Sequence, residues 1–296
     1  MSSKNKSYDK VIFNIIGYPL ISIFAIFCLI PFVMIISSSF TSEEYIIKYG
    51  YSIIPRQFSL ESYRLTLQNP VAILRAYGVT ILVTVIGTAL GVFINAMTGY
   101  VLQRKDFRWR NIFSFYFFFT TLFSGGLVPW YILCVKYLHL KDSFFALFVP
   151  SLVSVWNILL SKGFMKGIPF EITESAKIDG AGDFTVFCKL IIPLSKPLLA
   201  TIGLFTALSY WNDWFYCMMF ISNEKLYTLQ YFLHRLLASV RAIRTIMEQS
   251  GMDIPTLPVE SMKMSLTVIV TGPIIFLYPF VQKYFVKGLT LGAVKG

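Results

Sequence analysis

The chain is organised around one polar stretch between two apolar runs, Pro169-Phe-Glu-Ile-Thr-Glu-Ser-Ala-Lys-Ile-Asp-Gly-Ala-Gly-Asp-Phe-Thr-Val-Phe-Cys-Lys-Leu-Ile-Ile-Pro-Leu-Ser-Lys-Pro197. Pro169 suits the first turn of a helix, where its missing N–H goes unused. Gly180 and Gly182 allow backbone angles that end a helix or reverse the chain, and Asp183 can cap a second helix. The prolines at the end of the stretch must stop or kink that helix. The pattern predicts two helices joined by a glycine turn, outside the bilayer.

Composition places this stretch in a membrane protein. The 296 residues are 56% hydrophobic and 14% charged, whereas charged residues make up about a quarter of a soluble domain. Six apolar runs are long enough to cross a bilayer, at about 12–40, 76–102, 112–135, 143–160, 198–221 and 265–284. Apolar and polar residues do not alternate within these runs, which excludes a transmembrane β-barrel. We therefore expect an all-α, six-span, single transmembrane domain over 1–296, with outer loops at 41–75 and 222–263. In the first outer loop we expect a surface helix capped at Ser59.

The basic residues indicate the orientation of the spans. The net charge is +11, and the short loop 103–111 holds four of the basic residues: Arg104, Lys105, Arg108 and Arg110. Short cytoplasmic loops carry such an excess, so both termini and the loop 162–197 are predicted to be cytoplasmic in a cell (plasma or inner) membrane. The positive charge is then explained by the orientation of the spans in the membrane, and no nucleic-acid partner is expected. The second run is rich in glycine, which predicts an interior helix.

The polar stretch also carries a family signature. Glu174-Ser175-Ala176, three residues, Gly180, nine residues and Leu190-Ile191-Ile192-Pro193 resemble the Glu-Ala-Ala-x3-Gly-x9-Ile-x-Leu-Pro of ABC importer permeases, with three mild departures. Asp179-Gly180-Ala181 further resembles the maltose-type branch. The resemblance implies a type I ABC importer permease fold and contact with an ATPase through Glu171, Glu174, Ser175, Ala176, Asp179, Gly180 and Pro193. The alternative is an interfacial helix with solvated charges.

Two segments inside the spans are candidates for a substrate pathway. Ser124 to Trp130 contains two glycines and a proline, which predict a bend or break that either lines a pathway or is purely structural. Ser209 to Tyr216 combines aromatic rings with an amide and a carboxylate, groups that can bind a sugar, or else forms an aromatic belt at the interface. The candidate pathway residues are Gly125, Gly126, Pro129, Tyr210, Trp211, Asn212, Asp213 and Trp214.

Two further segments resemble the lipo-oligosaccharide and polygalacturonan-type permeases. The outer loop 222–263 predicts a helix from Tyr227 to Gln249 before a proline-rich piece, and the tail 278–296 matches that group closely. In the maltose-type branch the tail reaches into the ATPase dimer, so the resemblance implies contact through Gly292, Lys295 and Gly296. A solvated tail is the alternative.

The sequence predicts transport without catalysis. It contains no phosphate-binding loop, no Ser/His/Asp arrangement and no metal-ligand spacing, so we expect no catalytic, cofactor or metal site in this chain. The resemblance implies oligosaccharide import with a second related permease, two ATPase subunits that hold ATP and Mg, an extracellular binding protein and membrane lipid. The alternatives are an ion-coupled secondary transporter, an ABC permease for a non-sugar solute and a membrane enzyme. No residue pattern identifies the oligosaccharide.

Overall fold

The computed structural model describes residues 5–68, 70–249, 258–273 and 275. In these ranges every regular element is a helix apart from an isolated antiparallel bridge between Thr41 and Phe58, so the expected all-α class is confirmed. The proposed tail contact at Gly292, Lys295 and Gly296 lies outside the described residues. The chain divides into two compact units.

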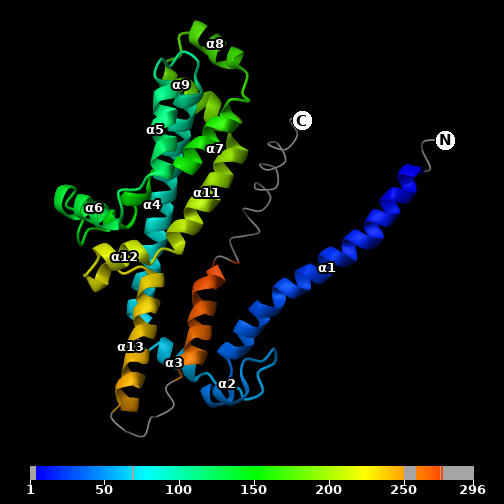
Figure 1. Cartoon of the computed structure of the whole chain (residues 1–296), viewed down its shortest axis with the longest axis vertical. Coiled ribbons are helices and arrows are strands. Elements are labelled where there is room, and N and C mark those ends of the chain that lie inside the picture. The colour runs from blue at the N-terminus through cyan, green and yellow to red at the C-terminus, as the bar shows by residue number, and fades with distance from the viewer. Residues whose placement is uncertain (1–4, 69, 250–257, 274, 276–296) are drawn as a thin grey trace. The chain divides into compact units, whose positions relative to one another are not determined.

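The first unit comprises Met1–Pro70 and Arg235–Pro273. Figure 1 shows its helices α1 (Asn5–Ser39), α2 (Glu43–Tyr49) and α3 (Glu61–Thr66), and residues 259–273 are also helical. The Ser42 side chain caps α2 by accepting from the Tyr45 N–H. The expected surface helix is α3, but its cap position is held by Leu60 and not by Ser59. The Ser59 hydroxyl still accepts from the N–H of Glu61, the first helical residue, at 3.2 Å. Helix α2, by contrast, was not foreseen from the sequence.

A buried carboxylate joins α2 to the helix over 259–273. The two Glu43 oxygens accept from the backbone N–H groups of Glu260 at 2.9 Å and Ser261 at 2.8 Å, and from the Ser261 hydroxyl at 2.9 Å. These amides belong to the first turn of a helix, where N–H groups have no partner within the helix and negative charge is favoured. Glu43 therefore holds two segments together that lie more than two hundred residues apart in the sequence.

We expect Glu43→Gln to destabilise the first unit by about 2–3 kcal/mol, because a carboxylate that accepts three hydrogen bonds is replaced by a neutral amide whose N–H₂ faces donors. Glu44→Gln is the matched control, since Glu44 is exposed and adjacent. Thermal unfolding of the purified protein should show a lower midpoint for Glu43→Gln alone. Equal midpoints for the two variants would contradict the capping role.

The second unit comprises Val71–His234 and Ile274–Gly296. Its helices are α4 (Pro70–Gln103), α5 (Arg110–Leu122), α6 (Leu127–Ile132), α7 (Val155–Met165), α8 (Phe170–Ile178), α9 (Asp183–Val186), α10 (Ile192–Leu194), α11 (Lys196–Trp211), α12 (Phe215–Phe220) and the start of α13 (Leu229–Gln249). Short 3₁₀ turns cover Phe144–Leu147, Val149–Ser151 and Glu224–Leu226, and π-helical turns cover Leu133–Tyr137 and Phe187–Ile191. In Figure 1 α8 lies near the C-terminal end of α4.

Helix α4 packs closely against its neighbours in this unit, as its glycines predict. A Cβ atom placed on Gly87 would lie 2.7 Å from the Tyr210 ring, and one on Gly99 would lie 2.5 Å from the Ser161 Cβ. Only glycine allows α11 and α7 to approach α4 this closely, so the expected interior position of this helix is confirmed.

Two helices are long and apolar enough to cross a membrane, Phe13–Ser39 and Pro70–Gln103. Three bent pairs would raise the number of spans to five: Arg110–Leu122 with Leu127–Tyr137 at 117°, Phe144–Ser151 with Val155–Met165 at 50°, and Asp183–Leu194 with Lys196–Trp211 at 86°. These are findings of length and composition in the described residues. The sixth run, 265–284, continues past residue 275, so the six-span topology stays a prediction.

Candidate functional site

The polar stretch folds into two helices joined by a glycine turn, as expected. Helix α8 ends at Ile178, Asp179 follows as its C-cap, and Gly180 then has φ +82°. The Gly180 N–H donates to the Lys177 carbonyl at 3.0 Å and the Ala181 N–H donates to the Ala176 carbonyl at 2.9 Å. This pair of bonds is a Schellman motif, which requires the left-handed conformation that glycine adopts without strain. Gly180 thus determines where α8 stops and in which direction the chain leaves it.

Two details of the expected helices were wrong. Pro169 is the residue before α8, with extended backbone at ψ 134°, and does not lie in its first turn. Asp183 does not cap the second helix, because Gly182 occupies the cap position and Asp183 is the first helical residue. The prolines act as predicted, since the helical run that begins at Asp183 stops at Leu194 and α11 leaves at 86° to it.

Helix α8 presents its acidic face to solvent. The residues proposed to contact an ATPase divide into an exposed set, Glu171, Glu174, Ser175, Asp179, Gly180 and Pro193, and the partly buried Ala176. Ala176 packs against an apolar cluster that includes Tyr100, Met165 and Phe187. The helix therefore rests on one side against the bundle, and its charged side is open to a partner.

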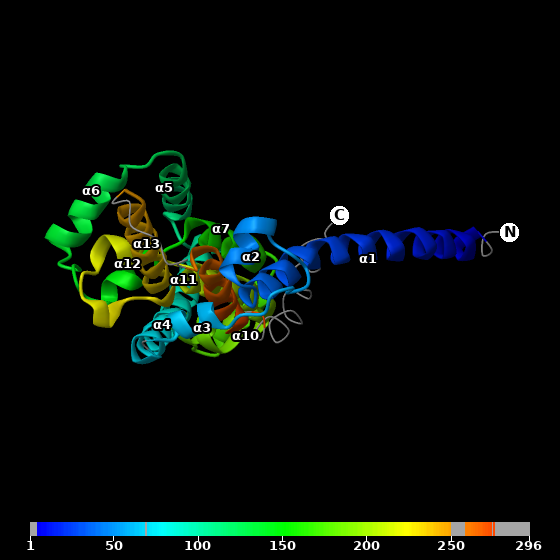
Figure 2. The ribbon, with the colours of Figure 1, turned by 90° about the horizontal axis from the view of Figure 1, so that it is seen from below.

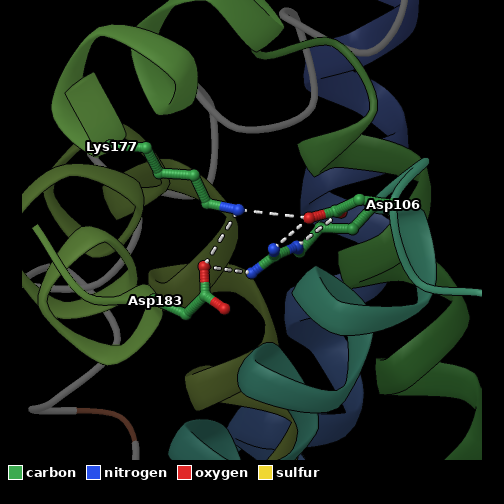
Figure 3. Close-up of polar contacts among 4 residues, drawn as sticks. Asp106, Lys177 and Asp183 are labelled. Carbon is green, nitrogen blue, oxygen red and sulfur yellow. Dashed lines mark hydrogen bonds and ion pairs between the residues drawn. The ribbon is translucent and has the colours of Figure 1, made fainter.

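Four charged side chains, here called the charge clamp, fix the glycine turn to the end of α4. They are Arg104, Asp106, Lys177 and Asp183 (Figure 3). Arg104 pairs with both acids, at 2.7 Å to Asp183, and Lys177 lies 3.2 Å from Asp106 and 3.3 Å from Asp183. The clamp thus joins α4, the end of α8 and the start of α9.

The clamp keeps its charges at neutral pH. Hydrogen bonds from the Arg104 guanidinium lower the pKa of the Asp106 and Asp183 carboxyls below their usual range, and the bond to Asp106 raises the pKa of Lys177. A carboxyl whose pKa is lowered in the folded state stabilises that state above its ordinary pKa of about 4, and loses the contribution as the pH falls through the lowered value. The clamp is therefore insensitive to pH near neutrality.

The expected break in the third apolar run is present. Helix α5 ends before Phe123, Gly126 has φ +85°, and α6 leaves at 117° to α5 (Figure 2). An open pocket of about 510 Å³ lies at the bend, lined by Gly125, Gly126 and Pro129 together with Phe215 and Tyr216. The glycine segment therefore meets the last two residues of the predicted aromatic segment, Ser209 to Tyr216.

The predicted aromatic cluster itself does not form one surface. Tyr210 and Trp211 are 3% and 6% exposed, and the Tyr210 hydroxyl donates to the Phe148 carbonyl at 3.1 Å. Their side chains are therefore packed in the interior of the unit.

The rest of the cluster lies at a break between helices. Helix α11 stops at Trp211 and α12 starts at Phe215. Asp213 was expected inside a continuous span, but it lies in the break between these two helices. The Asp213 carboxylate accepts from the Tyr216 N–H at 3.2 Å, which satisfies a backbone donor in the first turn of α12, whose cap position is Trp214. Asn212 accepts from the Gln230 side chain at 3.2 Å, and the Trp214 ring stacks on His234 with centroids 4.9 Å apart. Asp213 therefore has a structural role at the start of α12.

Residues 87–291 match the family described as "Binding-protein-dependent transport system inner membrane component". The chain belongs to this family. It is 36% identical, over 99% of its own length and 100% of the relative, to a Bacillus subtilis (strain 168) protein named polygalacturonan/rhamnogalacturonan transport system permease protein YtcP. It is also 37% identical to Protein LplC of the same strain, over 90% of each chain.

A solved structure supports the same assignment. The chain matches one protein in the crystal structure of a bacterial ABC transporter involved in the import of the acidic polysaccharide alginate, with a TM-score of 0.77 and 29% identity, over 94% of this chain and 98% of that one. The expected type I ABC importer permease fold and the family resemblance are both confirmed. The chain is thus a membrane component of a binding-protein-dependent transporter.

Proposed function

We propose that this chain is the permease subunit of an ABC importer that carries an acidic, uronate-containing oligosaccharide into the cytoplasm. The observation that carries the mechanism is the geometry of α8, a short helix with an exposed acidic face whose end is fixed to α4 by the charge clamp. A force applied to such a helix passes into the bundle without first unfolding a flexible loop. Two ATPase subunits holding ATP and Mg supply that force, and Glu171 and Glu174 form part of the contact.

The substrate class in this proposal comes from the relatives. One is named for polygalacturonan and rhamnogalacturonan, and the solved transporter imports alginate, so both names point to polymers rich in sugar acids. A second related permease and an extracellular binding protein complete the proposed assembly. The transport cycle is an alternation between inward-facing and outward-facing arrangements that ATP biases.

Uptake into proteoliposomes that contain the chain and its partner subunits tests this proposal. We expect oligogalacturonate to accumulate only when ATP is enclosed, at least tenfold above the level without ATP, and to continue when an ionophore removes ion gradients. Uptake that needs the gradient instead of ATP would identify a secondary transporter. Accumulation of a non-sugar solute, with no oligosaccharide competing, would contradict the substrate class.

A further inference from the structure

A second cavity, separate from the pocket at the α5–α6 bend, lies between α4, α7 and α11 and has a volume of about 340 Å³. Its lining includes Asn95, Trp156, Asn157, Phe205, Ser209 and Tyr210, and no lining residue is charged. The volume falls at the lower end of the range of about 300–1,000 Å³ that is usual for ligand sites. The cavity is therefore large enough for a small part of a chain-like ligand.

Some polar groups of the cavity are hydrogen-bonded within the protein. The Asn95 amide donates to the carbonyls of Gly91 at 2.6 Å and Leu152 at 2.8 Å, and its oxygen accepts from the Ser154 N–H at 2.9 Å. The bonds to Leu152 and Ser154 satisfy backbone groups in the break between the 3₁₀ turns and α7. Asn95 thus builds the cavity wall, and both of its N–H donors are used within the protein.

Three other polar groups have no hydrogen-bond partner among the described residues. Asn157 is only 7% exposed, and although its amide donates to Thr206 at 3.2 Å, its oxygen accepts no hydrogen bond. The Ser209 hydroxyl and the Trp156 indole N–H are also unpaired. Helices α7 and α11 belong to candidate spans, where an unsatisfied polar group costs several kcal/mol against lipid. These groups therefore face water, a ligand or another polar surface.

Aromatic rings stand beside these unpaired groups. Trp156 is 72% exposed and Phe205 is 43% exposed. An exposed ring offers a flat apolar face to the C–H groups of a sugar, while a carboxamide oxygen, a hydroxyl and an indole N–H together can accept from and donate to sugar hydroxyls. One cavity is therefore lined both by aromatic rings and by unpaired polar groups. Binding of a pyranose ring requires this combination.

We propose that this cavity is a sugar-binding subsite on the translocation route, which holds one pyranose unit against Trp156 through bonds to Asn157 and Ser209. This inference rests on the proposed function and deepens it. Because no charged side chain lines the cavity, the subsite binds the hydroxyl face of the sugar and does not distinguish a uronate from a neutral sugar. Selection for the acid group then takes place elsewhere in the importer.

The test compares import of oligogalacturonate by the assembled transporter in proteoliposomes. Trp156→Leu should reduce import about tenfold at subsaturating substrate, because the stacking surface is lost, and Trp156→Phe should restore most of it. Ser209→Ala should reduce import about threefold, as expected for one neutral hydrogen bond. Trp109→Leu is the matched control, since Trp109 is exposed and outside the cavity. All variants should retain stimulation of ATP hydrolysis by the loaded binding protein.

Three results would overturn the subsite. Import by Trp156→Leu and Ser209→Ala equal to wild type would show that no sugar binds there. A loss shared equally by Trp109→Leu would show a general effect of removing an exposed tryptophan. Loss of the second permease from purified Trp156→Leu complexes would assign this face to subunit contact. If the wild-type transporter imports no oligosaccharide at all, the proposed function fails, which is a separate outcome.

Discussion

Replacing Gly180 with valine is expected to reduce ATP-driven uptake to less than about a tenth of the wild-type rate. Gly180 has φ +82°, and a β-branched residue is rarely found at such an angle, with a cost of about 1–2 kcal/mol or more. The strain is relieved when the Schellman bonds break, so the end of α8 moves away from the clamp. Uptake, complex assembly and ATP hydrolysis should be measured together.

Gly182 provides the matched control for this variant. It lies two residues away, has an ordinary φ of −68°, and like Gly180 has no heavy atom within 4 Å of the position of an added Cβ. Gly182→Val should therefore retain more than about half of the uptake, and Gly180→Asn should be intermediate because asparagine tolerates the left-handed region. Equal loss in Gly180→Val and Gly182→Val would show that bulk, and not backbone angle, is responsible.

Reversing the charge of Lys177 is expected to lower coupling between ATP hydrolysis and uptake about fivefold. Lys177→Glu removes the pairs with Asp106 and Asp183 and places a third acid beside them. Partly exposed pairs of this kind contribute up to about 1 kcal/mol, which corresponds to a factor of about five in an equilibrium. The prediction is that ATP hydrolysis continues while substrate moved per ATP decreases.

Lys189→Glu is the control for charge alone. Lys189 is exposed on the same polar stretch and forms no ion pair in the described residues. Its variant should couple normally, and Lys177→Arg should retain coupling because the positive charge remains. If Lys189→Glu lost as much coupling as Lys177→Glu, the effect would come from net charge and not from the clamp.

The helices and turns of the polar stretch were predictable because their signals are local. Gly180 acts through its own backbone angle, and Pro193 and Pro197 act on the turns next to them. The bend at Gly126 was predictable for the same reason. Such features need no knowledge of what lies elsewhere in the fold.

The charge clamp could not be predicted in this way, because it depends on tertiary contact. The sequence indicates only that Arg104 belongs to a basic loop, and it predicts that its partner Asp183 caps a helix. The only sequence signal is Asp106, a single acid within the basic segment 103–111, and Asp183 carries no such signal. Glu43 was missed for the same reason, since its partners Glu260 and Ser261 lie in a distant part of the sequence.

The aromatic cluster illustrates a different limit. Tyr210, Trp211 and Trp214 are close in sequence, and their composition suits a sugar site. Helix α11 ends within this segment, which separates the buried Tyr210 and Trp211 from the exposed Trp214. The cavity at Trp156 was not foreseen, because its polar lining comes from three helices that the sequence does not place together.

The central claim is that α8 is the contact through which an ATPase moves this permease. Distance-limited cross-linking tests it most directly, with a cysteine in place of Glu174 and the exposed Cys28 replaced by serine. Lys225→Cys, exposed in the predicted outer loop, serves as the control. The account predicts a permease–ATPase product with Glu174→Cys and none with Lys225→Cys. Intact complexes in which Glu174→Cys gives no such product would contradict it.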